Sequence, residues 1–241
     1  MSIAARAWVC AAIFGLTLAG TSGARADGLF DRILGVLGIS ATPSQMRGDS
    51  DVSEGQIWMA QVEIGGGNAL TGDSGYRWPV YEPGGKAVIA LKGGNAVRIS
   101  EDSGEVKILH KIPGVQKLVG ADREDSDKLL VILDEDAAPL ALLSLKTGRL
   151  TPLPYDPKSK DHRRMLSHVK GEERLYGTTR IYVKTQTKQG MEGTLEWTDV
   201  YVQQGKATPR NVSNCDGVSC GQPSLSTDGV ALVYVRARGT P

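Results

Sequence analysis

Residues 222–235 read Gln-Pro-Ser-Leu-Ser-Thr-Asp-Gly-Val-Ala-Leu-Val-Tyr-Val, which combines a short strand, a polar turn and an apolar strand. Asp228-Gly229 suits a tight hairpin turn, because glycine adopts a positive φ without steric cost. Pro223 is expected to start the first strand, where a missing backbone N–H does no harm. This stretch therefore predicts a β-hairpin at the C-terminal end of the chain.

The same layout recurs upstream. Residues 78–91 read Trp-Pro-Val-Tyr-Glu-Pro-Gly-Gly-Lys-Ala-Val-Ile-Ala-Leu, and Pro79 is expected to start a strand there as well. More divergent copies run over residues 117–133 and 165–177. Other strands are predicted over residues 56–64, 179–185 and 196–202.

A second unit alternates with the first: a glycine turn followed by a short strand, at Gly67, Gly104, Gly148 and Gly205. Repeats of about 40 to 50 residues are typical of propellers. Residues 56–71 and residues 222–235 each hold half a repeat, and together they complete one four-stranded unit. We therefore predict an all-β fold, a small propeller of four blades in which strands from both chain ends share one blade.

Residues 222–235 resemble the signature repeat of TolB-type propellers, in which Pro and Ser-Pro-Asp-Gly precede an apolar strand. Residues 78–91 are similar, with Glu82-Pro83-Gly84-Gly85 at the turn. The two middle copies lack these features, so the resemblance covers two repeats. It implies a periplasmic protein-binding platform that works with cell-envelope machinery.

Residues 1–26 follow the plan of a secretory signal peptide. The apolar run over residues 7–19 is shorter than the roughly 20 residues of a bilayer span. Ala24-Arg25-Ala26 supplies the small-x-small cleavage pattern, so the mature chain is expected to begin at Asp27. The prediction is a periplasmic or secreted protein without stable membrane insertion after cleavage.

The expected mature chain has three parts. Residues 27–40 predict an amphipathic helix, residues 41–54 a polar linker, and residues 55–241 the propeller domain. The helix is expected to pack on its own domain or to dock in a groove of another protein. Its apolar face comprises Leu29, Phe30, Ile33, Leu34 and Leu37.

Charge and cysteine content limit the classes of partner and of metal site that the chain is expected to have. The chain has 28 Lys and Arg against 27 Asp and Glu, and loss of Arg6 and Arg25 leaves a mature net charge of −1. So balanced a chain is not expected to bind nucleic acid. Cys215 and Cys220 predict a disulfide in an oxidising compartment. The alternative, a metal pair, needs two more ligands, and the three histidines are distant in sequence.

Three patterns resemble chemical sites, and each has a simpler interpretation. Gly217-Val-Ser-Cys-Gly221 matches the nucleophile elbow, but we interpret it as a loop around the disulfide. Acidic residues at 122–127 and 134–136 suit hairpin turns, with calcium as the alternative. The basic segment holds Lys158, Lys160, His162, Arg163 and Arg164, and is expected to be a solvated loop or a patch for an anionic partner.

No catalytic, cofactor-binding or metal-binding residue is predicted. The expected function is a non-catalytic protein-binding or scaffold module whose partner is a cell-envelope protein. The alternatives are a metal-dependent propeller hydrolase or lactonase, and a propeller that binds a small ligand or glycan. For the last, Trp58, Trp78 and Trp197 are the largest aromatic candidates, although strand patterns place Trp58 and Trp78 in the core.

Overall fold

The computed structural model describes residues 52–122, 125–133, 140–154, 156, 158–159, 174–191 and 193–237. The regular secondary structure of these residues consists of β-strands. No described segment forms a helix long and apolar enough to cross a membrane. The predicted signal peptide with its cleavage site, the helix over residues 27–40 and the linker up to residue 51 lie outside the described residues.

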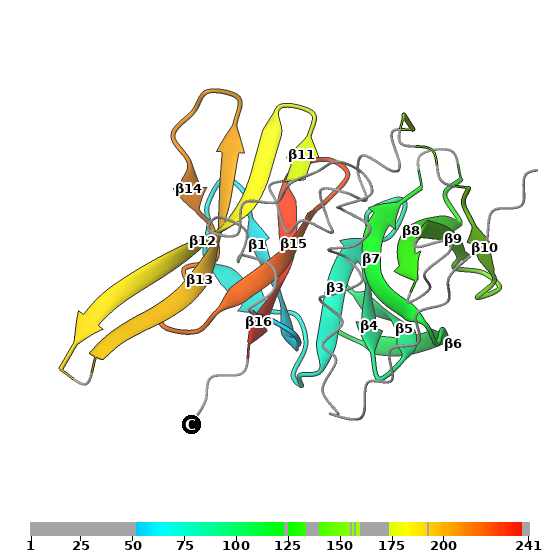
Figure 1. The fold of residues 1–241 in the computed structure, drawn as a ribbon, viewed down its shortest axis with the longest axis horizontal. Helices are drawn as coiled ribbons and strands as arrows, with labels where there is room; N and C mark the ends of the chain where they lie inside the picture. Colours follow the sequence, from blue (N-terminus) through cyan, green and yellow to red (C-terminus); the bar gives the residue numbers. More distant parts are fainter. Residues whose placement is uncertain are drawn as a thin grey trace, which may run out of the picture. The chain divides into compact units, whose positions relative to one another are not determined.

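Sixteen strands form four groups of four in the described part of the chain (Figure 1). The terminal sheet has the order β15 (Cys220–Leu225), β16 (Ala231–Ala237), β1 (Gly55–Gln61), β2 (Gly67–Ala69). The second sheet holds β3 (Tyr76–Tyr81), β4 (Ala87–Lys92), β5 (Asn95–Ser100) and β6 (Val106–Lys111). The third sheet holds β7 (Val115–Ala121), β8 (Lys128–Leu133), β9 (Leu140–Ser144) and β10 (Leu150–Pro152). The fourth holds β11 (Arg174–Tyr176), β12 (Thr179–Gly190), β13 (Gly193–Gln204) and β14 (Arg210–Asn211).

The two ends of the described chain meet in the terminal sheet. β1 pairs with β16 in antiparallel register, from Gly55 opposite Ala237 to Gln61 opposite Ala231. This confirms the predicted pairing of the first strand with the last. One backbone pair, Gly55 opposite Tyr76, joins the terminal and second sheets, so these two groups of four form one continuous eight-stranded sheet.

Each glycine turn of the second repeat unit leads to the outermost strand of a sheet, as the alternation of the two units predicts. The turns at Gly104, Gly148 and Gly205 precede β6, β10 and β14, and Gly67 begins β2. The hairpin at Asp228-Gly229 is also present, since the Gly229 N–H donates to the Ser226 carbonyl at 3.0 Å.

Pro79 and Pro223 were expected to start strands. In the structure they lie inside β3 and β15 instead. The pairing register shifts between Arg77 and Val80 in β3, and between Gly221 and Ser224 in β15. Both shifts are bulges, which is where an interior strand can tolerate a residue without an N–H. The residue before each proline, Trp78 or Gln222, has a positive φ, at 52° and 53°.

Gln222 connects three segments at these bulges. Its buried side chain accepts a hydrogen bond from the Trp78 N–H at 2.5 Å and donates to the Val52 carbonyl. Buried amides need such partners, because an unpaired polar group in the core costs about 1 to 3 kcal/mol. Gln222 therefore joins β15, β3 and the chain that enters β1.

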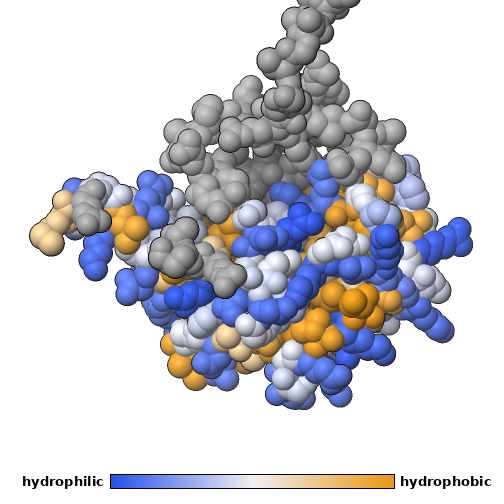
Figure 2. Space-filling model, turned by 90° about the horizontal axis from the view of Figure 1, so that it is seen from below, coloured by the Kyte–Doolittle hydropathy of each residue, from blue (hydrophilic) through white to orange (hydrophobic). Residues whose placement is uncertain are grey.

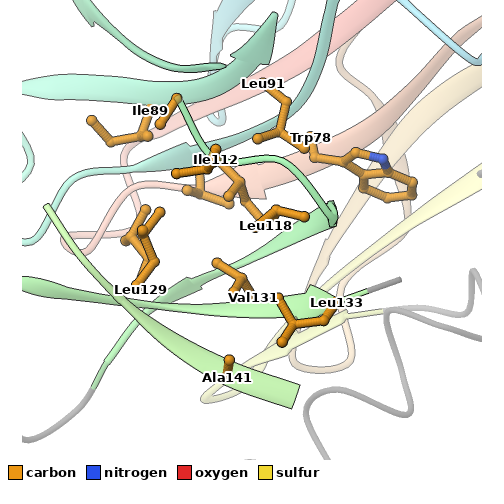
Figure 3. Packing of buried hydrophobic residues seen from close by; sticks show 13 residues of the cluster. Trp78, Ile89, Leu91, Ile112, Leu118, Leu129, Val131, Leu133 and Ala141 are labelled. Carbon is orange, nitrogen blue, oxygen red and sulfur yellow. The ribbon is translucent and has the colours of Figure 1, made fainter. Parts of the chain in front are cut away.

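Three apolar clusters join the four sheets. One cluster packs the second sheet against the third, with Ile89, Leu118 and Leu129 near its centre (Figure 3). Another joins the terminal and second sheets through Ile57, Tyr76 and Val233. The last joins the terminal and fourth sheets, and includes the disulfide. The sheets thus contact one another in the order fourth, terminal, second, third.

Sequence and structure differ at the ends of three predicted strands. The first strand was predicted to run to Ile64, but β1 ends at Gln61 and Ile64 lies in a turn with 77% of its surface exposed. The strands predicted over residues 179–185 and 196–202 are longer, because β12 and β13 continue outward to Gly190 and Gly193.

Candidate functional site

β12 and β13 form one long hairpin. They pair without interruption from Thr179 opposite Gln204 to Gly190 opposite Gly193. We call residues 184–197 the ribbon; Figure 1 shows it extending away from the other strands. Its described side chains are exposed or half-buried, and Met191 in the turn is fully exposed while Leu195 is 49% exposed. None of the ribbon's described side chains is therefore fully buried.

A buried carboxylate fixes the base of the ribbon. Asp199, 3% exposed, accepts hydrogen bonds from the Ser213 hydroxyl at 3.0 Å and the Cys215 N–H at 2.7 Å through Oδ1. Its Oδ2 accepts from the Asn211 amide at 3.0 Å and the Trp197 indole N–H at 3.2 Å. Four donors satisfy this charge, as burial requires. Asp199 thereby ties β13 to the loop after β14.

The disulfide loop supports the ribbon from the same side. The predicted bond between Cys215 and Cys220 is present. Thr198 donates its N–H to Ser219 Oγ at 3.3 Å and its hydroxyl to the Cys220 carbonyl at 2.9 Å. The loop leads directly into β15, so the Gly-x-Ser-x-Gly pattern is not the strand-to-helix turn of a nucleophile elbow. Ser219 lies in a loop, as we interpreted it.

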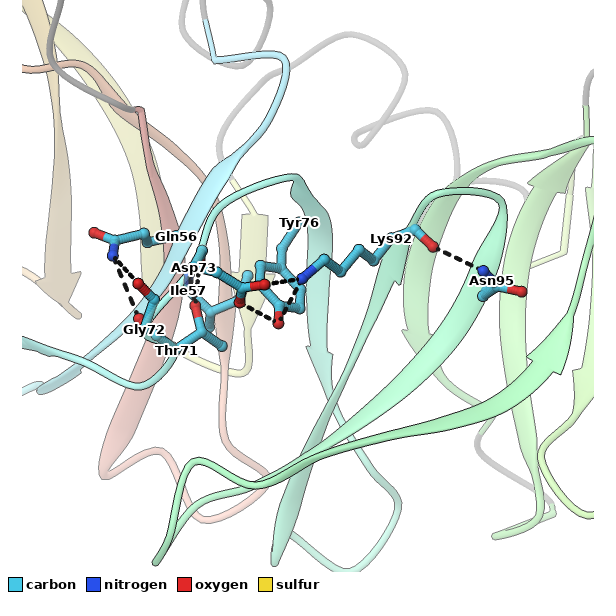
Figure 4. Close-up of polar contacts among 8 residues, drawn as sticks. All are labelled: Gln56, Ile57, Thr71, Gly72, Asp73, Tyr76, Lys92 and Asn95. Carbon is cyan, nitrogen blue, oxygen red and sulfur yellow. Dashed lines mark hydrogen bonds and ion pairs between the residues drawn. The ribbon is translucent and has the colours of Figure 1, made fainter.

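A second polar cluster lies where the terminal and second sheets meet (Figure 4). Lys92 Nζ contacts Asp73 Oδ2 and donates to the Tyr76 hydroxyl at 3.1 Å, and that hydroxyl donates to Asp73 Oδ1 at 2.7 Å. The Thr71 hydroxyl accepts from the Ile57 N–H at 3.1 Å. Lys92, Tyr76 and Asp73 have the residue types of an acid–base site, so their protonation decides whether they can act as one.

Their pKa shifts oppose such a role. The hydrogen bond from Lys92, followed by that from Tyr76, lowers the pKa of Asp73 below 3.8. Burial lowers the pKa of Lys92, but bonding to Asp73 and Tyr76 outweighs it and raises that pKa overall. Burial, and then the bond to Asp73, raises the pKa of Tyr76. A general acid or base works best with a pKa near the operating pH, whereas these shifts move the pKa values of Asp73, Lys92 and Tyr76 further from neutrality. The cluster is a structural clamp between β1, β3 and β4.

Tyr81 and Glu101 also have shifted pKa values. Burial, reinforced by Glu101, raises the pKa of Tyr81, and burial is likewise the main reason why the pKa of Glu101 is raised. Perturbed groups often mark active sites. Tyr81, however, is only 4% exposed and belongs to the apolar cluster between the terminal and second sheets, where no substrate reaches it.

The described residues of the predicted acidic cluster make contacts that stabilise the turn in which they lie. Asp125 forms an ion pair with Lys128 at 2.8 Å, and Asp127 accepts from the Ser144 hydroxyl at 2.8 Å. Glu124 and residues 134–136 lie outside the described residues. Within the described ranges, no three His, Cys, Asp or Glu side chains are grouped as metal ligands would be.

The other predicted candidates are dispersed. His110 Nε2 lies 2.8 Å from the Leu145 carbonyl, whereas His162 and His168 fall outside the described residues, as do Lys160, Arg163 and Arg164. Trp78 is buried as predicted, and Trp58 is half-buried against the cluster that includes the disulfide. Trp197 is half-buried at the base of the ribbon.

Apolar residues also reach the surface, in patches between hydrophilic residues on the face shown in Figure 2. Val106 and Ile108 on β6 are 38% and 65% exposed, but they pair with Ile99 and Val97 of the core. They are the rim of a packed interface. On the ribbon, Leu195 lies close to Gly217 of the disulfide loop, whereas Met191 in the turn is fully exposed.

Sequence reasoning did not identify the ribbon as a site. Its outer half, Thr-Lys-Gln-Gly-Met-Glu-Gly-Thr from Thr187, lacks the alternation of apolar residues that marks a half-buried strand. The available signal was a pair of glycines flanking a two-residue turn between runs rich in threonine, a residue that favours strands.

Comparison with known proteins adds distant likenesses only. No protein family matches the chain, and no curated protein matches it. Among solved structures, a putative TolB from Agrobacterium tumefaciens is 12% identical over 73% of this chain, with a TM-score of 0.36. TolB from Acinetobacter baumannii is 14% identical over 71%, with a TM-score of 0.31. An oligogalacturonate lyase in complex with manganese is 21% identical over 73%, with a TM-score of 0.28.

This chain spans 59% of the first TolB chain, 46% of the second and 51% of the lyase chain. Likeness at these levels concerns the fold alone and includes both a TolB and an enzyme. It supplies no argument about function, which therefore rests on the geometry of this chain.

Proposed function

We propose that this chain is an exported, non-catalytic β-propeller that binds another protein, and that the ribbon is its docking element. The observation that carries this proposal is an ordered two-stranded arm that exposes Met191 and Leu195. Asp199 and the disulfide loop hold its base. Exposed apolar groups on a fixed support are typical of surfaces that bind protein partners.

The propeller is part of the same proposal. Four groups of four antiparallel strands follow one another in the described chain, and β1 pairs with β16 so that both chain ends share a group. We take each group as one blade of a four-bladed propeller. A blade shared by the two ends resists unfolding from either terminus, which suits a module that works as a rigid support.

Export is supported by two features. The N-terminal residues follow the plan of a signal peptide, and the bond between Cys215 and Cys220 is compatible with an oxidising compartment. The proposed location is therefore the periplasm or the outside of the cell, with a cell-envelope protein as the partner.

Site-specific photo-crosslinking in cells of the source organism tests the proposal. A photo-reactive residue at Met191 is expected to capture one recurrent protein. The same group at Val230, which is 56% exposed on the terminal sheet, serves as the matched control. Equal capture at both positions, or capture at Val230 alone, would contradict a docking role for the ribbon.

Deletion of residues 27–40 tests whether the predicted helix contributes to docking. Loss of capture at Met191 in this variant would assign docking to the helix instead. Metal analysis of the purified protein tests the alternative, a metal-dependent hydrolase or lactonase, which stoichiometric calcium or zinc would favour.

A further inference from the structure

The ribbon has one backbone edge whose direction can be derived. Val200 on β13 directs its backbone away from β12, because its N–H donates to Ser213 Oγ and its carbonyl accepts from the Val212 N–H. Val183 is its cross-strand partner. In an antiparallel ladder, both residues of such a pair point outward, and the direction alternates along each strand. The N–H and C=O groups of Thr185, Thr187 and Gln189 therefore point outward from β12.

No described strand lies along this part of β12. β11 pairs with β12 only from Thr179 to Ile181. The side chains of Lys184, Thr185 and residues 187–190 are exposed. An exposed edge of this kind is a template for an added strand, a recognised mode of peptide binding.

One face of this edge strand is cationic. Lys184 and Lys188 occupy alternate positions with Gln186 between them, so all three share a face. Lys184 lies opposite Asp199, but that carboxylate is occupied by its four donors, and Lys188 lies opposite Leu195. Lys184 Nζ lies over the Tyr201 ring, 5.6 Å from its centroid, but among the described residues neither lysine forms an ion pair.

The charge pattern disfavours one pairing of two copies of this chain, the antiparallel pairing centred on Gln186. If two β12 edges paired antiparallel about Gln186, Lys184 of each copy would face Lys188 of the other. Like charges directly opposite each other destabilise a strand pair. The same positions favour a partner strand that carries carboxylates, since opposite charges in cross-strand pairs are stabilising.

We propose that the outward edge of β12 binds an extended acidic segment of the partner protein as an additional strand of the fourth sheet. This inference rests on the proposed function and specifies the chemistry of its partner. The backbone edge supplies the hydrogen bonds, and Lys184 and Lys188 select carboxylates on one face. Because the lysines are four residues apart, the two carboxylates are expected four residues apart, about 13 Å along an extended strand.

The test uses the purified exported protein and labelled synthetic peptides in fluorescence anisotropy. The probe is a threonine- and valine-based peptide with glutamates at two positions four residues apart. Its counterparts carry glutamine or lysine at the same positions. The glutamate peptide is expected to bind most tightly. Equal affinity for the three peptides would overturn the proposal.

Charge reversal tests the role of the lysines. The double variant Lys184→Glu with Lys188→Glu is expected to bind the glutamate peptide about tenfold more weakly and to prefer the lysine peptide. Unchanged preference would show that these lysines do not read the partner.

Backbone substitution tests strand addition itself. Thr187→Pro removes an outward N–H and is expected to weaken binding by about tenfold or more, while the ladder to β13 keeps its bonds. The control is Glu196→Pro, at the residue directly opposite on β13. It stresses the same hairpin but leaves the β12 edge intact, so its affinity is expected to stay within about twofold of wild type. Equal losses in the two variants would contradict edge binding.

Heparin and polyglutamate distinguish strand addition from a general attraction to anions. Neither is expected to bind Thr187→Pro more weakly than wild type. If heparin displaced the glutamate peptide as well as unlabelled peptide did, the cationic face alone would explain binding and the proposal would fail. Capture at Met191 tests the proposed function separately: capture without the peptide preference would leave that function standing and overturn this inference.

Discussion

β8 and the outer half of β12 are both regular strands, yet they are held in place by different forces. In β8 every residue from Leu129 to Leu133 is buried, and the strand contributes Leu129, Val131 and Leu133 to the cluster between the second and third sheets. From Lys184 to Gly190, β12 pairs with β13 alone among the described strands, and its side chains are mostly exposed. Burial of apolar area dominates stability, so the first strand supports the fold and the second is available for recognition.

The largest contrast is expected between a core leucine and a ribbon leucine. Leu129→Ala removes a fully buried side chain and is expected to lower the free energy of unfolding by about 2 to 5 kcal/mol. Leu195→Ala makes the same chemical change at a half-exposed position and is expected to cost less than about 1 kcal/mol. Denaturant unfolding measures both. Equal losses would mean that the ribbon is part of the core.

The junction between the two regions is expected to be sensitive to the Asp199 carboxylate. Asp199→Asn places an amide donor among four donors, and we expect a loss of about 2 to 3 kcal/mol in stability. Trp197 provides a second readout, because its indole N–H donates to Asp199 Oδ2 and its fluorescence reports that contact.

Asp216→Asn is the matched control for this junction. Asp216 is an exposed residue of the disulfide loop with a φ of 42°, a conformation that asparagine accepts. A loss at Asp216 as large as that at Asp199 would assign the effect to the loop rather than to the buried carboxylate.

In the terminal sheet, close packing leaves no room for a methyl group at Gly67. A Cβ there would lie 2.0 Å from the hydroxyl oxygen of Tyr234, so Gly67→Ala is expected to cost about 1 to 3 kcal/mol. The Tyr234 hydroxyl is buried and makes no hydrogen bond with described residues, and burial raises the pKa of Tyr234 to about 12. Tyr234→Phe alone is therefore expected to be neutral or slightly stabilising.

A double-mutant cycle separates the clash from other effects. In the Tyr234→Phe background, Gly67→Ala is expected to cost less, because the nearest atom has been removed. Additive losses would show that the close approach does not limit this position.

Outside the ribbon, the smallest expected effect on stability concerns the exposed ion pair of Asp73 and Lys92. Asp73→Asn is expected to cost less than about 1 kcal/mol, because surface pairs contribute little. The folded-state pKa of Asp73 is lowered, so its contribution is present above the ordinary value of 3.8 and is lost as pH falls through the lower folded value. Urea unfolding across that acidic range tests the sign. A difference between wild type and variant that grows on acidification would contradict it; Asp102→Asn is the control.

The buried strands could be read from sequence because burial imposes a pattern. Residues 129–133, at the end of the repeat copy predicted over residues 117–133, are a continuous apolar run and form most of β8. The pairing of β1 with β16 followed from counting incomplete repeats at the two ends. In both cases, the signal came from side chains that must be covered.

What could not be read depends on backbone geometry and on polar contacts between distant segments. The outer ribbon is held by a ladder that any polar sequence with a suitable turn can form, so no apolar pattern marks it. The bulges at Trp78 and Gln222 depend on a hydrogen bond between residues 144 positions apart. No sequence pattern marked Asp199 either, because its four hydrogen-bond donors lie at scattered positions before and after it in the sequence.

Shortening the ribbon tests most directly whether it serves recognition rather than stability. Replacement of residues 187–196 by Asn-Gly joins Gln186 to Trp197, which already face each other across the hairpin, through a turn that suits two-residue connections. Thermal unfolding, and photo-crosslinking from a photo-reactive residue at Thr185, which is exposed and is kept in the shortened chain, would be compared between the shortened chain and the full-length ribbon. We predict an unchanged melting temperature, within a few degrees, together with loss of the captured partner. A fall in melting temperature comparable to that of Leu129→Ala, or a partner still captured, would contradict the account.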